Sequence, residues 1–371
     1  MKRKLTELCS IQYGYPFDSA KFTEDSNYPQ LIRIRDVKRG YSETFYSGEY
    51  PKEYIVHAGD LLIGMDGEFN IARWKSQDAL LNQRVCKISA KEGTDEEYLR
   101  FALIGALKEI EDRTSFATVK HLSAKELNKL ELDVPCYEEQ KNIANIINKI
   151  EKIIGARKQQ LSALDDLIKA RFVEMFGDYD LLLQKPNWVP IAEIGTVVGG
   201  STPKTSNPEY WNGEYRWISP AELEADSGII YESVKKITKA GVESCSLQEL
   251  PIGTVILSSR APIGKVAIAG NTFYCNQGFK NIVCNEKVIP RYLYTLLLFN
   301  TYYLNSLGRG ATFKEISKSI VENIRIPLPP IEAQEKFNTF ISKVDKMKEA
   351  LKKSQDETQR LFDSLMQQYF G

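Results

Sequence analysis

The sequence contains few of the residues that build metal sites and disulfide frameworks. The two histidines are His57 and His121, and the six cysteines, which include no CxxC pair, are Cys9, Cys86, Cys136, Cys245, Cys275 and Cys284. Zinc sites are usually built from closely spaced pairs of Cys and His, and small secreted domains rely on many cysteines. We therefore expect reduced thiols, no metal site and no cofactor.

The chain also lacks long apolar runs and a net charge. No run of about 18 apolar residues is present, and Met1–Lys4 leads into mixed polar sequence rather than an apolar signal core. These absences favour a cytoplasmic protein with no membrane contact. The 49 basic and 49 acidic residues cancel, whereas a nucleic-acid-binding protein usually has a basic excess. Any basic surface must therefore be local.

Signatures of catalysis are missing as well. There is no GxxxxGK[ST] motif, so Lys265 after Gly264 is not the lysine of a phosphate loop. The segment 207–210 (NPEY) is close to the Asn/Asp-Pro-Pro-aromatic tetrad of DNA methyltransferases, but Glu209 replaces a proline, which favours a surface turn. The nuclease-like spelling E-x-K at 139–141 opens a helix, where acidic residues complement the helix dipole. We expect no catalytic centre in this chain.

An internal repeat organises the sequence. A shift of 194 residues brings Gly59–Ile63 onto Gly253–Leu257 and Asn82-Gln83 onto Asn276-Gln277. Nearer the N-terminus, Gly14 meets Gly200 at a shift of 186 residues, so the second copy carries an insertion of about eight residues. The chain therefore consists of two copies of one unit.

The first part of each copy, residues 1–137 and 177–330, is predicted to be an α+β domain. Short β-type runs such as 30–34 and 254–258 are broken by Gly, Asn and Pro. Helical stretches at 96–110 and 290–307 interrupt these runs. The fold class we predict is two tandem mixed α/β domains, each followed by a long helix.

The second part of each copy, residues 138–176 and 331–371, is predicted to be that long helix. Apolar residues recur at the 3.5-residue spacing of a coiled coil. The seam that we expect is formed by Ile143, Ile147, Ile150, Ile154, Leu161, Leu164 and Ile168 in the first helix, and by Phe337, Val344, Met347, Leu351, Leu361 and Leu365 in the second. An antiparallel pair of helices, each about 57 Å long, would hold the two domains in pseudo-twofold symmetry. The alternative is that each helix packs only on its own domain.

The junction between domain and helix is the most distinctive duplicated feature. It reads LELDVPCYEEQ at 130–140 and IRIPLPPIEAQ at 324–334. Together with Gly59–Leu62, the two Asn-Gln pairs and the segment 258–265, these residues resemble the specificity subunits of type I restriction-modification systems over essentially the whole chain. The first copy departs from the second in having one proline at the junction and Arg84 where the second has Gly278, which leaves its loop geometry open.

The resemblance implies a non-catalytic, DNA-binding subunit. In that family each target-recognition domain reads one half of a split DNA sequence in the major groove, where base edges can be distinguished, and the helix pair sets the unread gap. The implied partners are double-stranded DNA, two modification (methyltransferase) subunits and the restriction (translocase-nuclease) subunits. A different class of protein, a coiled-coil adaptor that binds only proteins, would account for the neutral net charge.

Candidate DNA-contacting residues are polar, aromatic or basic residues of the predicted loops. They are Tyr13, Arg33, Arg35, Arg73, Arg84 and Lys120 in the first copy, and Thr202, Lys204, Ser219, Arg260, Lys265, Lys280 and Lys314 in the second. Arg260 is the strongest candidate, because it follows an apolar strand and enters a Pro/Gly turn that would project its guanidinium outward. The repeated Asn-Gln pairs indicate a shared scaffold role for their amides.

Overall fold

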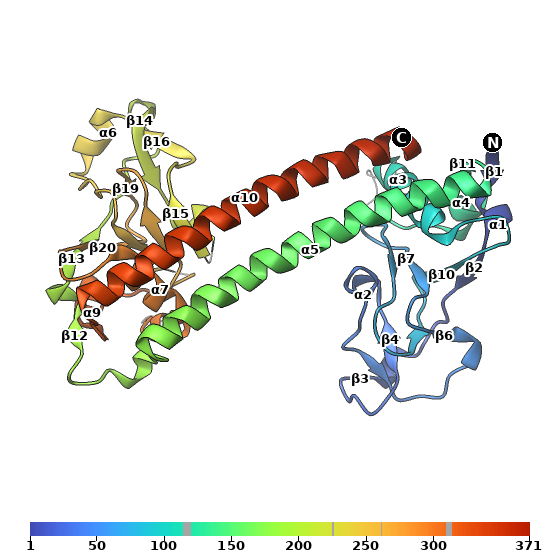
Figure 1. Cartoon of the computed structure of the whole chain (residues 1–371), viewed down its shortest axis with the longest axis horizontal. Helices are drawn as coiled ribbons and strands as arrows, with labels where there is room; N and C mark the ends of the chain where they lie inside the picture. The colour runs from blue at the N-terminus through green and yellow to red at the C-terminus, as the bar shows by residue number, and fades with distance from the viewer. Residues whose placement is uncertain (114–119, 225, 261, 309–313) are drawn as a thin grey trace. The chain divides into compact units, whose positions relative to one another are not determined.

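Two helices of 40 residues, α5 (Tyr137–Phe176) and α10 (Ile331–Phe370), connect to two mixed α/β globules in the computed structural model (Figure 1). The structure describes residues 1–113, 120–224, 226–260, 262–308 and 314–371. The chain divides into two compact units: unit 1 comprises residues 1–159 and 351–371, and unit 2 comprises residues 160–350. Each unit therefore contains one globule and a segment of both long helices.

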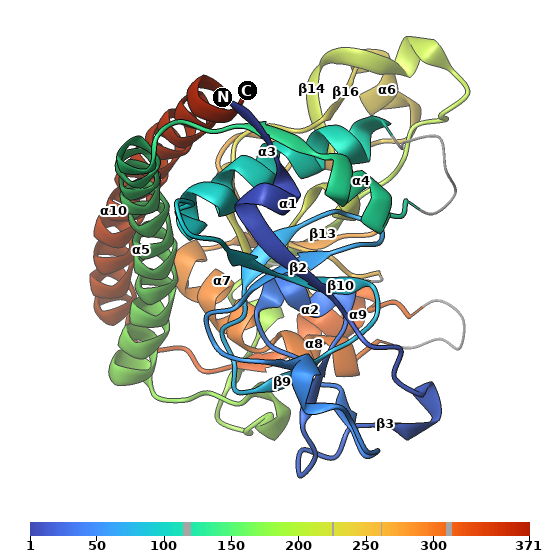
Figure 2. The same cartoon turned by 90° about the vertical axis from the view of Figure 1, so that its right-hand side faces the viewer.

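The described residues of unit 1 form three sheets and, besides the long helices, four α-helices. The sheets have the strand orders β1 (Lys2–Lys4)-β11 (Glu131–Asp133); β2 (Cys9–Tyr13)-β10 (Val85–Ala90)-β7 (Leu61–Gly64)-β8 (Ile71–Arg73); and β3 (Phe22–Thr23)-β5 (Phe45–Tyr46)-β4 (Gln30–Ile32)-β9 (Ala79–Leu81)-β6 (Ile55–Val56). The helices are α1 (Leu5–Leu8), α2 (Ile34–Arg39), α3 (Glu96–Arg113) and α4 (Ala124–Lys129). Strand β2 lies beside β10 in an antiparallel pair (Figure 2).

Unit 2 repeats this plan, with one more strand in the main sheet, β15 (Asp226–Ile230), and a smaller third sheet. Its sheets have the orders β12 (Val189–Pro190)-β21 (Arg325–Ile326); β13 (Gly195–Gly199)-β20 (Lys280–Cys284)-β17 (Val255–Leu257)-β18 (Val266–Ala269)-β15 (Asp226–Ile230); and β16 (Lys235–Ile237)-β14 (Trp211–Ile218)-β19 (Tyr274–Cys275). Its shorter helices are α6 (Lys239–Ser244), α7 (Pro290–Phe299), α8 (Thr301–Ser306) and α9 (Lys318–Asn323). The order β13-β20-β17-β18 matches β2-β10-β7-β8 of unit 1, so the sequence repeat is a repeat of the fold.

The central strand of each main sheet is buried on both faces. In β7, Leu61 and Ile63 enter one apolar cluster and Leu62 enters another, because successive side chains of a strand point to opposite faces. In β17, Val255 and Leu257 enter one cluster and Ile256 enters another. The near-continuous apolar runs in the sequence reflect this two-sided burial.

The helix predicted over 290–307 is divided into α7 and α8. Asn300 lies between them in a non-helical conformation and is buried. Its side-chain Oδ1 accepts a hydrogen bond from the Leu181 N–H at 2.9 Å, and its Nδ2 donates to the Tyr179 carbonyl at 3.0 Å. The amide thus ties the chain that follows α5 to α7, a long-range contact that local periodicity does not reveal.

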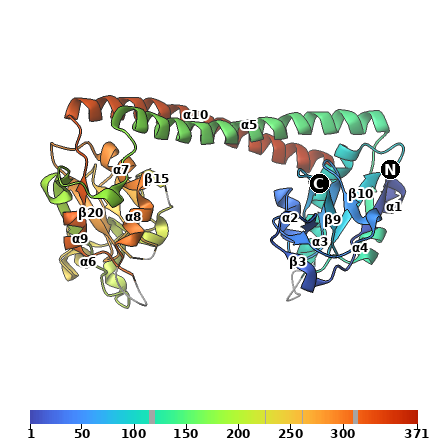
Figure 3. The ribbon, with the colours of Figure 1, turned by 90° about the horizontal axis from the view of Figure 1, so that it is seen from below.

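In unit 1, the first part of α5 and the last part of α10 complete the same apolar core. Ile143, Ala144 and Ile147 of α5 are buried there, and Phe362 and Phe370 of α10 pack against them. The predicted seam residues Ile150 and Ile154 are also buried. The two helix segments lie side by side (Figure 3), and Arg157 donates hydrogen bonds to the Ser354 carbonyl and the Thr358 hydroxyl across their contact.

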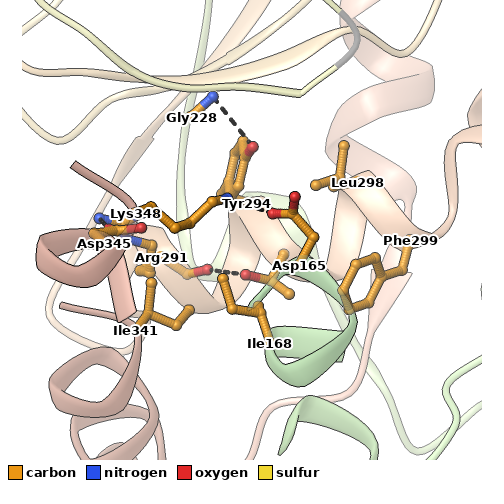
Figure 4. A pocket seen from close by; sticks show the side chains of 11 residues that line it. Asp165, Ile168, Gly228, Arg291, Tyr294, Leu298, Phe299, Ile341, Asp345 and Lys348 are labelled. Carbon is orange, nitrogen blue, oxygen red and sulfur yellow. Dashed lines mark hydrogen bonds and ion pairs between the residues drawn. The ribbon is translucent and has the colours of Figure 1, made fainter. Parts of the chain in front are cut away.

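In unit 2, the last part of α5 and the first part of α10 complete the apolar core. The rings of Phe172 and Phe337 pack edge to face, with centroids 5.4 Å apart, and Ile341 and Val344 are buried beside them. A cavity of about 160 Å³ lies next to this contact, and the ion pairs Arg291–Asp345 and Lys348–Asp165 line it (Figure 4). Each long helix therefore packs on both globules' cores rather than on its own alone.

Two of the predicted seam positions lie outside the helix contact. Met347 and Leu361 are 57% and 51% exposed, whereas Phe362 packs against Phe101 of α3. The contact between the helices includes the polar residue Thr358, which Arg157 contacts, so counting apolar residues alone selects Leu361 in place of Phe362. Met347, before Leu351, lies off the contact for a separate reason: Val344 is the buried residue of that turn. The remaining seam residues, Leu161, Leu164, Ile168, Leu351 and Leu365, are partly buried.

Close backbone approach explains the glycines that align at a shift of 186 residues. A Cβ atom on Gly14 would lie 2.0 Å from the carbonyl oxygen of Asn82, and one on Gly200 would lie 2.1 Å from the carbonyl oxygen of Cys275. These contacts join the end of β2 and of β13 to the segments that contain the Asn-Gln pairs. Neither position can accept a side chain without a backbone shift.

The structure describes the state of the cysteines, the groups that could bind a metal ion and the apolar character of the helices. All six cysteines are free, and burial raises the pKa of the Cys86 and Cys275 thiols to about 12. Among the described residues, no group of three or more His, Cys, Asp and Glu side chains is placed to hold a metal ion. Within the same residues, none of the helices combines the length and the apolar character that a membrane span requires.

We expect Gly14→Ala to lower the free energy of unfolding by about 1–3 kcal/mol, because the added methyl group meets a carbonyl oxygen that is fixed by the sheet. Gly155→Ala is the matched control. Gly155 lies within α5 with open space around its Cβ position, so alanine should raise stability by about 0.5–1 kcal/mol. Urea unfolding followed by circular dichroism measures both. Equal effects of the two substitutions would contradict the close approach.

A second pair of variants tests the orientation of α5. Ile147 is fully buried and Ile146 is 44% exposed. We expect Ile147→Ala to destabilise the protein by about 2–4 kcal/mol, because it leaves a cavity in the core of unit 1, and Ile146→Ala to change stability by less than about 0.5 kcal/mol. Thermal and urea unfolding of the two variants give the comparison, and the reverse ranking would show that the helix is rotated.

Candidate nucleic-acid interface

A junction of three chain segments recurs at the same place in both units. In unit 1, the Met65 N–H donates to the Arg84 carbonyl at 2.8 Å, and the Leu122 N–H donates to the Met65 carbonyl at 2.7 Å. In unit 2, the Ser259 N–H donates to the Gly278 carbonyl at 2.7 Å, and the Ile316 N–H donates to the Ser259 carbonyl at 2.9 Å. We call this feature the three-segment junction. It joins the end of the central strand to the loop after the Asn-Gln pair and to the segment before α4 or α9.

In unit 1 the junction carries a cluster of Asp66, Arg84 and His121. The Asp66 and His121 backbones form an antiparallel bridge, and the Asp66 carboxylate lies 2.5 Å from His121 Nδ1 and 3.5 Å from Arg84 Nε. Arg84 Nη1 lies 3.2 Å from the same His121 Nδ1. Arg84 and His121 are both about half exposed. The cluster therefore presents a guanidinium and an imidazole to solvent.

Arg84 adopts an unusual backbone conformation. Its φ is 75°, in the left-handed region that side chains other than Asn, Asp and Gly rarely occupy. The carbonyl of this residue accepts the Met65 N–H, and its side chain is held by Asp66. The strained backbone is thus held by the junction, and it directs a charged side chain outward.

In unit 2 the junction carries Arg260, Lys280 and Glu315. Arg260 and Glu315 form the equivalent antiparallel bridge. Arg260 Nε donates to Glu315 Oε2 at 3.0 Å, and Lys280 Nζ donates to Glu315 Oε1 at 3.2 Å. Burial alone would raise the pKa of Glu315, but the hydrogen bonds from Lys280 and Arg260 bring it below its ordinary value of 4.5. Glu315 is therefore ionised near neutral pH and orients both cations.

Two other candidates in unit 1 lie around one hollow. Arg33 and Arg35 are exposed and line a depression of about 710 Å³, together with the acidic residues Glu24 and Glu43. The Arg33 N–H donates to Asp36 Oδ2 at 2.9 Å at the start of α2. Ser219, which aligns with Arg33, likewise donates its N–H to Glu222 Oε1 at 3.1 Å. The turn in which a backbone N–H donates to the carboxylate three residues later thus carries Arg33 in unit 1 and Ser219 in unit 2.

Four candidate cations are engaged by partners inside the protein. Arg73 forms ion pairs with Glu96 and Glu97, and Lys120 forms one with the buried carboxylate of Glu111. Lys265 Nζ donates to the carbonyls of Pro220 and Leu223, and Lys280 contacts Glu315 as described above. These contacts assign each of the four a structural role, and their contact with DNA stays a prediction.

The remaining candidates are more open to solvent. Lys204 and Lys314 are exposed, and Tyr13 is partly exposed, with its hydroxyl 3.4 Å from Asn128 Oδ1. The Thr202 hydroxyl donates to Gln277 Oε1 at 2.6 Å, which brings a candidate residue onto one of the Asn-Gln pairs. Nothing in these positions by itself identifies a base contact.

The Asn-Gln pairs and the NPEY segment have local structural roles. Asn276 Oδ1 accepts the Gly278 N–H at 2.9 Å, within the three-segment junction of unit 2. Asn207 Oδ1 accepts the Glu209 N–H at 3.2 Å at the start of a short 3-10 helix, Pro208–Tyr210. The first contact agrees with the scaffold role inferred from the repeat, and the second shows NPEY as a capped turn.

Sequence reasoning missed Asp66, His121 and Glu315. The shift of 194 residues places Asp66 on Arg260 and His121 on Glu315, so the alignment held the signal once Arg260 had been singled out. Asp66 and Glu315 were missed because an acidic residue is not an obvious DNA contact, and only polar, aromatic and basic residues were considered as candidates.

The lowered pKa of Glu315 has a testable consequence for stability. A carboxyl group whose folded-state pKa is depressed stabilises the fold above its unfolded-state pKa, and this contribution is lost as the pH falls through the folded-state value. We expect Glu315→Gln to be less stable than the wild type at pH 7, and the difference to shrink below about pH 4.5. The midpoints of urea unfolding of the wild type and the variant, at pH 7 and at pH 3.5, measure this difference in stability. A difference that does not change with pH would contradict the ion pair.

Comparison with known proteins places these features in a family. The family model described as type I restriction modification DNA specificity domain matches residues 1–164 and again residues 187–359. The specificity subunit of type I restriction enzyme MjaIX from Methanocaldococcus jannaschii is 39% identical over 210 residues, which cover 55% of this chain and 48% of that protein. The specificity subunit of EcoBI from Escherichia coli is 38% identical over 170 residues, covering 46% and 36%. The matched sequence spans about half or less of these two relatives.

Solved structures support the same fold. The type I restriction-modification S subunit from M. genitalium superposes with a TM-score of 0.61 at 14% identity, covering 100% of this chain and 96% of that one. A chain from a study of complex assembly and conformational transition of the type I system superposes with a TM-score of 0.58 at 18% identity, covering 100% and 97%. Since the family model matches both halves of the sequence, the chain belongs to the type I restriction-modification DNA specificity family.

Proposed function

We propose that the chain is the DNA-reading specificity subunit of a type I restriction-modification complex. Residues 1–137 form one target-recognition domain and residues 177–330 the other, and each reads one half of a bipartite DNA sequence. The chain docks modification subunits, which carry the methyltransferase activity, and restriction subunits join that complex. The chain itself has no catalytic role.

The observation that carries this proposal is the duplicated three-segment junction. A protein that reads two DNA blocks needs two sites with the same scaffold but different side chains, since sequence is distinguished by contacts to base edges and not by contacts to phosphates. The two junctions share their backbone hydrogen bonds and differ in their exposed side chains, with Asp66, Arg84 and His121 in one and Arg260 and Glu315 in the other.

The long helices fit a spacer role in this proposal. A helix of 40 residues is about 60 Å long at 1.5 Å per residue, and one turn of duplex DNA measures about 34 Å. Helices of this length are sufficient for half-sites separated by several unread base pairs. The burial of both helices in each core supports a firm attachment of the helices to each globule. If a helix separated from a globule, its apolar face and the apolar core beneath it would be exposed to water.

The competing function is that of a coiled-coil adaptor which binds only proteins. The zero net charge favours it, and so does the engagement of Arg73, Lys120, Lys265 and Lys280 by partners within the chain. Exposed guanidinium groups at both junctions favour the DNA reader. The two functions differ in whether the complex acts at a defined DNA sequence.

The decisive experiment maps DNA methylation at single-base resolution in cells that carry this chain with the modification subunit from the same source. We expect a split motif, with two short specified blocks around a gap of fixed length, because two separate domains read the DNA. Cells that carry the modification subunit alone are the control, and the motif should be absent from them. A soluble complex that co-purifies but yields no motif would contradict the DNA reader and favour the adaptor.

A further inference from the structure

A side-chain pair that contains one carboxylate recurs at the three-segment junction, with the carboxylate on the other segment. At the shift of 194 residues, Asp66 corresponds to Arg260, and His121 corresponds to Glu315. Both pairs are joined by the same antiparallel bridge, so they occupy equivalent places in the two folds. The acidic partner lies on the strand-end segment in unit 1 and on the segment before α9 in unit 2.

Each junction holds one exposed arginine against one carboxylate. Arg84 Nε lies 3.5 Å from Asp66 Oδ2, and Arg260 Nε lies 3.0 Å from Glu315 Oε2. Both guanidinium groups are about half exposed. Each carboxylate contacts Nε in these pairs. Arg84 Nη1 also lies 3.2 Å from His121 Nδ1, and because each terminal nitrogen of a guanidinium carries two N–H groups, both arginines keep terminal N–H groups that can donate to a base. Terminal N–H groups in a fixed fork are the donors that arginine uses for bidentate contacts.

The chemistry of this pair fits a base better than a phosphate. Guanine presents O6 and N7 as two adjacent acceptors in the major groove, and arginine donates to both. A carboxylate next to the guanidinium orients the fork before DNA binds. The same carboxylate offsets the charge of the guanidinium and would repel a phosphate placed beside it. In unit 2, Glu315 also pairs with Lys280, so that junction keeps one further positive charge. It can also accept from the N4 amino group of a cytosine.

The backbone of Arg84 provides an independent observation. A left-handed conformation is unfavourable for arginine, and such strain is typically retained where function requires a particular side-chain direction. The equivalent residue in unit 2 is Gly278, which has no side chain, and there the arginine comes from the strand-end segment instead. Both units thus place one guanidinium at the junction, but the arginine belongs to a different segment of the junction in each unit.

We propose that Arg84 and Arg260 each read one guanine, in different halves of the DNA target, and that Asp66 and Glu315 are the residues that position them. This inference rests on the proposed function, since it names the base-reading residues of a DNA specificity subunit. It assigns one specified G·C pair to each domain.

The test maps methylation motifs for the complete complex with Arg84→Gln or Arg260→Gln. We expect each variant to lose the preference for guanine at one position by roughly 10- to 100-fold, and to lose it in a different block of the motif. The block that each variant leaves intact is the internal control, because it shows that the complex is still folded and active. Arg3→Gln is the matched control: this half-buried arginine of β1 pairs with Glu7 of α1, outside the junction, and the motif of this variant should be unchanged.

Two further variants separate base reading from other roles of the same arginine. Arg84→Lys keeps the charge but not the fork, so a base reader should lose the preference as the Gln variant does, and full retention would indicate a phosphate contact and overturn the inference. Asp66→Asn keeps Arg84 and removes the positioning charge, so the guanine preference should weaken at the position that the Arg84 variants affect. This variant also keeps the inference testable if the Arg84 variants fail to fold.

The outcomes distinguish this inference from the function on which it rests. A split motif in the wild type that is unchanged in both arginine variants would overturn only the reading of guanine. A uniform loss of methylation at every site, with no change in base preference, would also overturn it. A wild-type complex without any motif would overturn the proposed function itself.

Discussion

The burial of apolar faces of α5 and α10 in the core of each unit is the constraint on which the rest of the structure depends. Ile143 and Ile147 of α5 and Phe362 of α10 belong to the core of unit 1, and Phe172 and Phe337 belong to that of unit 2. Neither globule has a complete core without both helices. Since burial of apolar surface is the main favourable term in folding, the helices are structural members of each globule as well as connections between them.

These cores also position the candidate interface. The central strands β7 and β17 are buried on both faces, and each ends directly at the three-segment junction. The junction is therefore anchored to a fully buried strand of its unit, while Arg84 and Arg260 remain about half exposed. A rigid base with variable surface residues is the arrangement that sequence readout requires, because side chains must reach base edges from fixed positions. Asp66 and Glu315 extend that rigidity to the guanidinium groups.

Much of this architecture could be predicted from the sequence, because duplication doubles each weak local signal. The repeat predicted two mixed α/β globules, and the long apolar spacing predicted a long helix after each of them. Three kinds of feature could not be predicted. The break at Asn300 depends on contacts with residues about 120 positions away in the chain. The seam phase near Leu361 depends on polar Thr358. The contacts of the Lys265 and Arg73 side chains depend on residues distant in the sequence. Residue type alone does not distinguish a cation with a partner inside the protein from one that is exposed to solvent.

The most direct test of DNA reading by this chain is the affinity of the modification complex, assembled with and without it, for a duplex that carries the mapped motif and for a scrambled duplex. With the chain present, the complex should bind the motif more tightly by at least about 10³-fold at physiological salt, and both affinities should fall steeply as salt is added, because bound phosphates release counterions. Equal affinity for the two duplexes, or the same affinity when the chain is omitted, would contradict DNA reading by this chain.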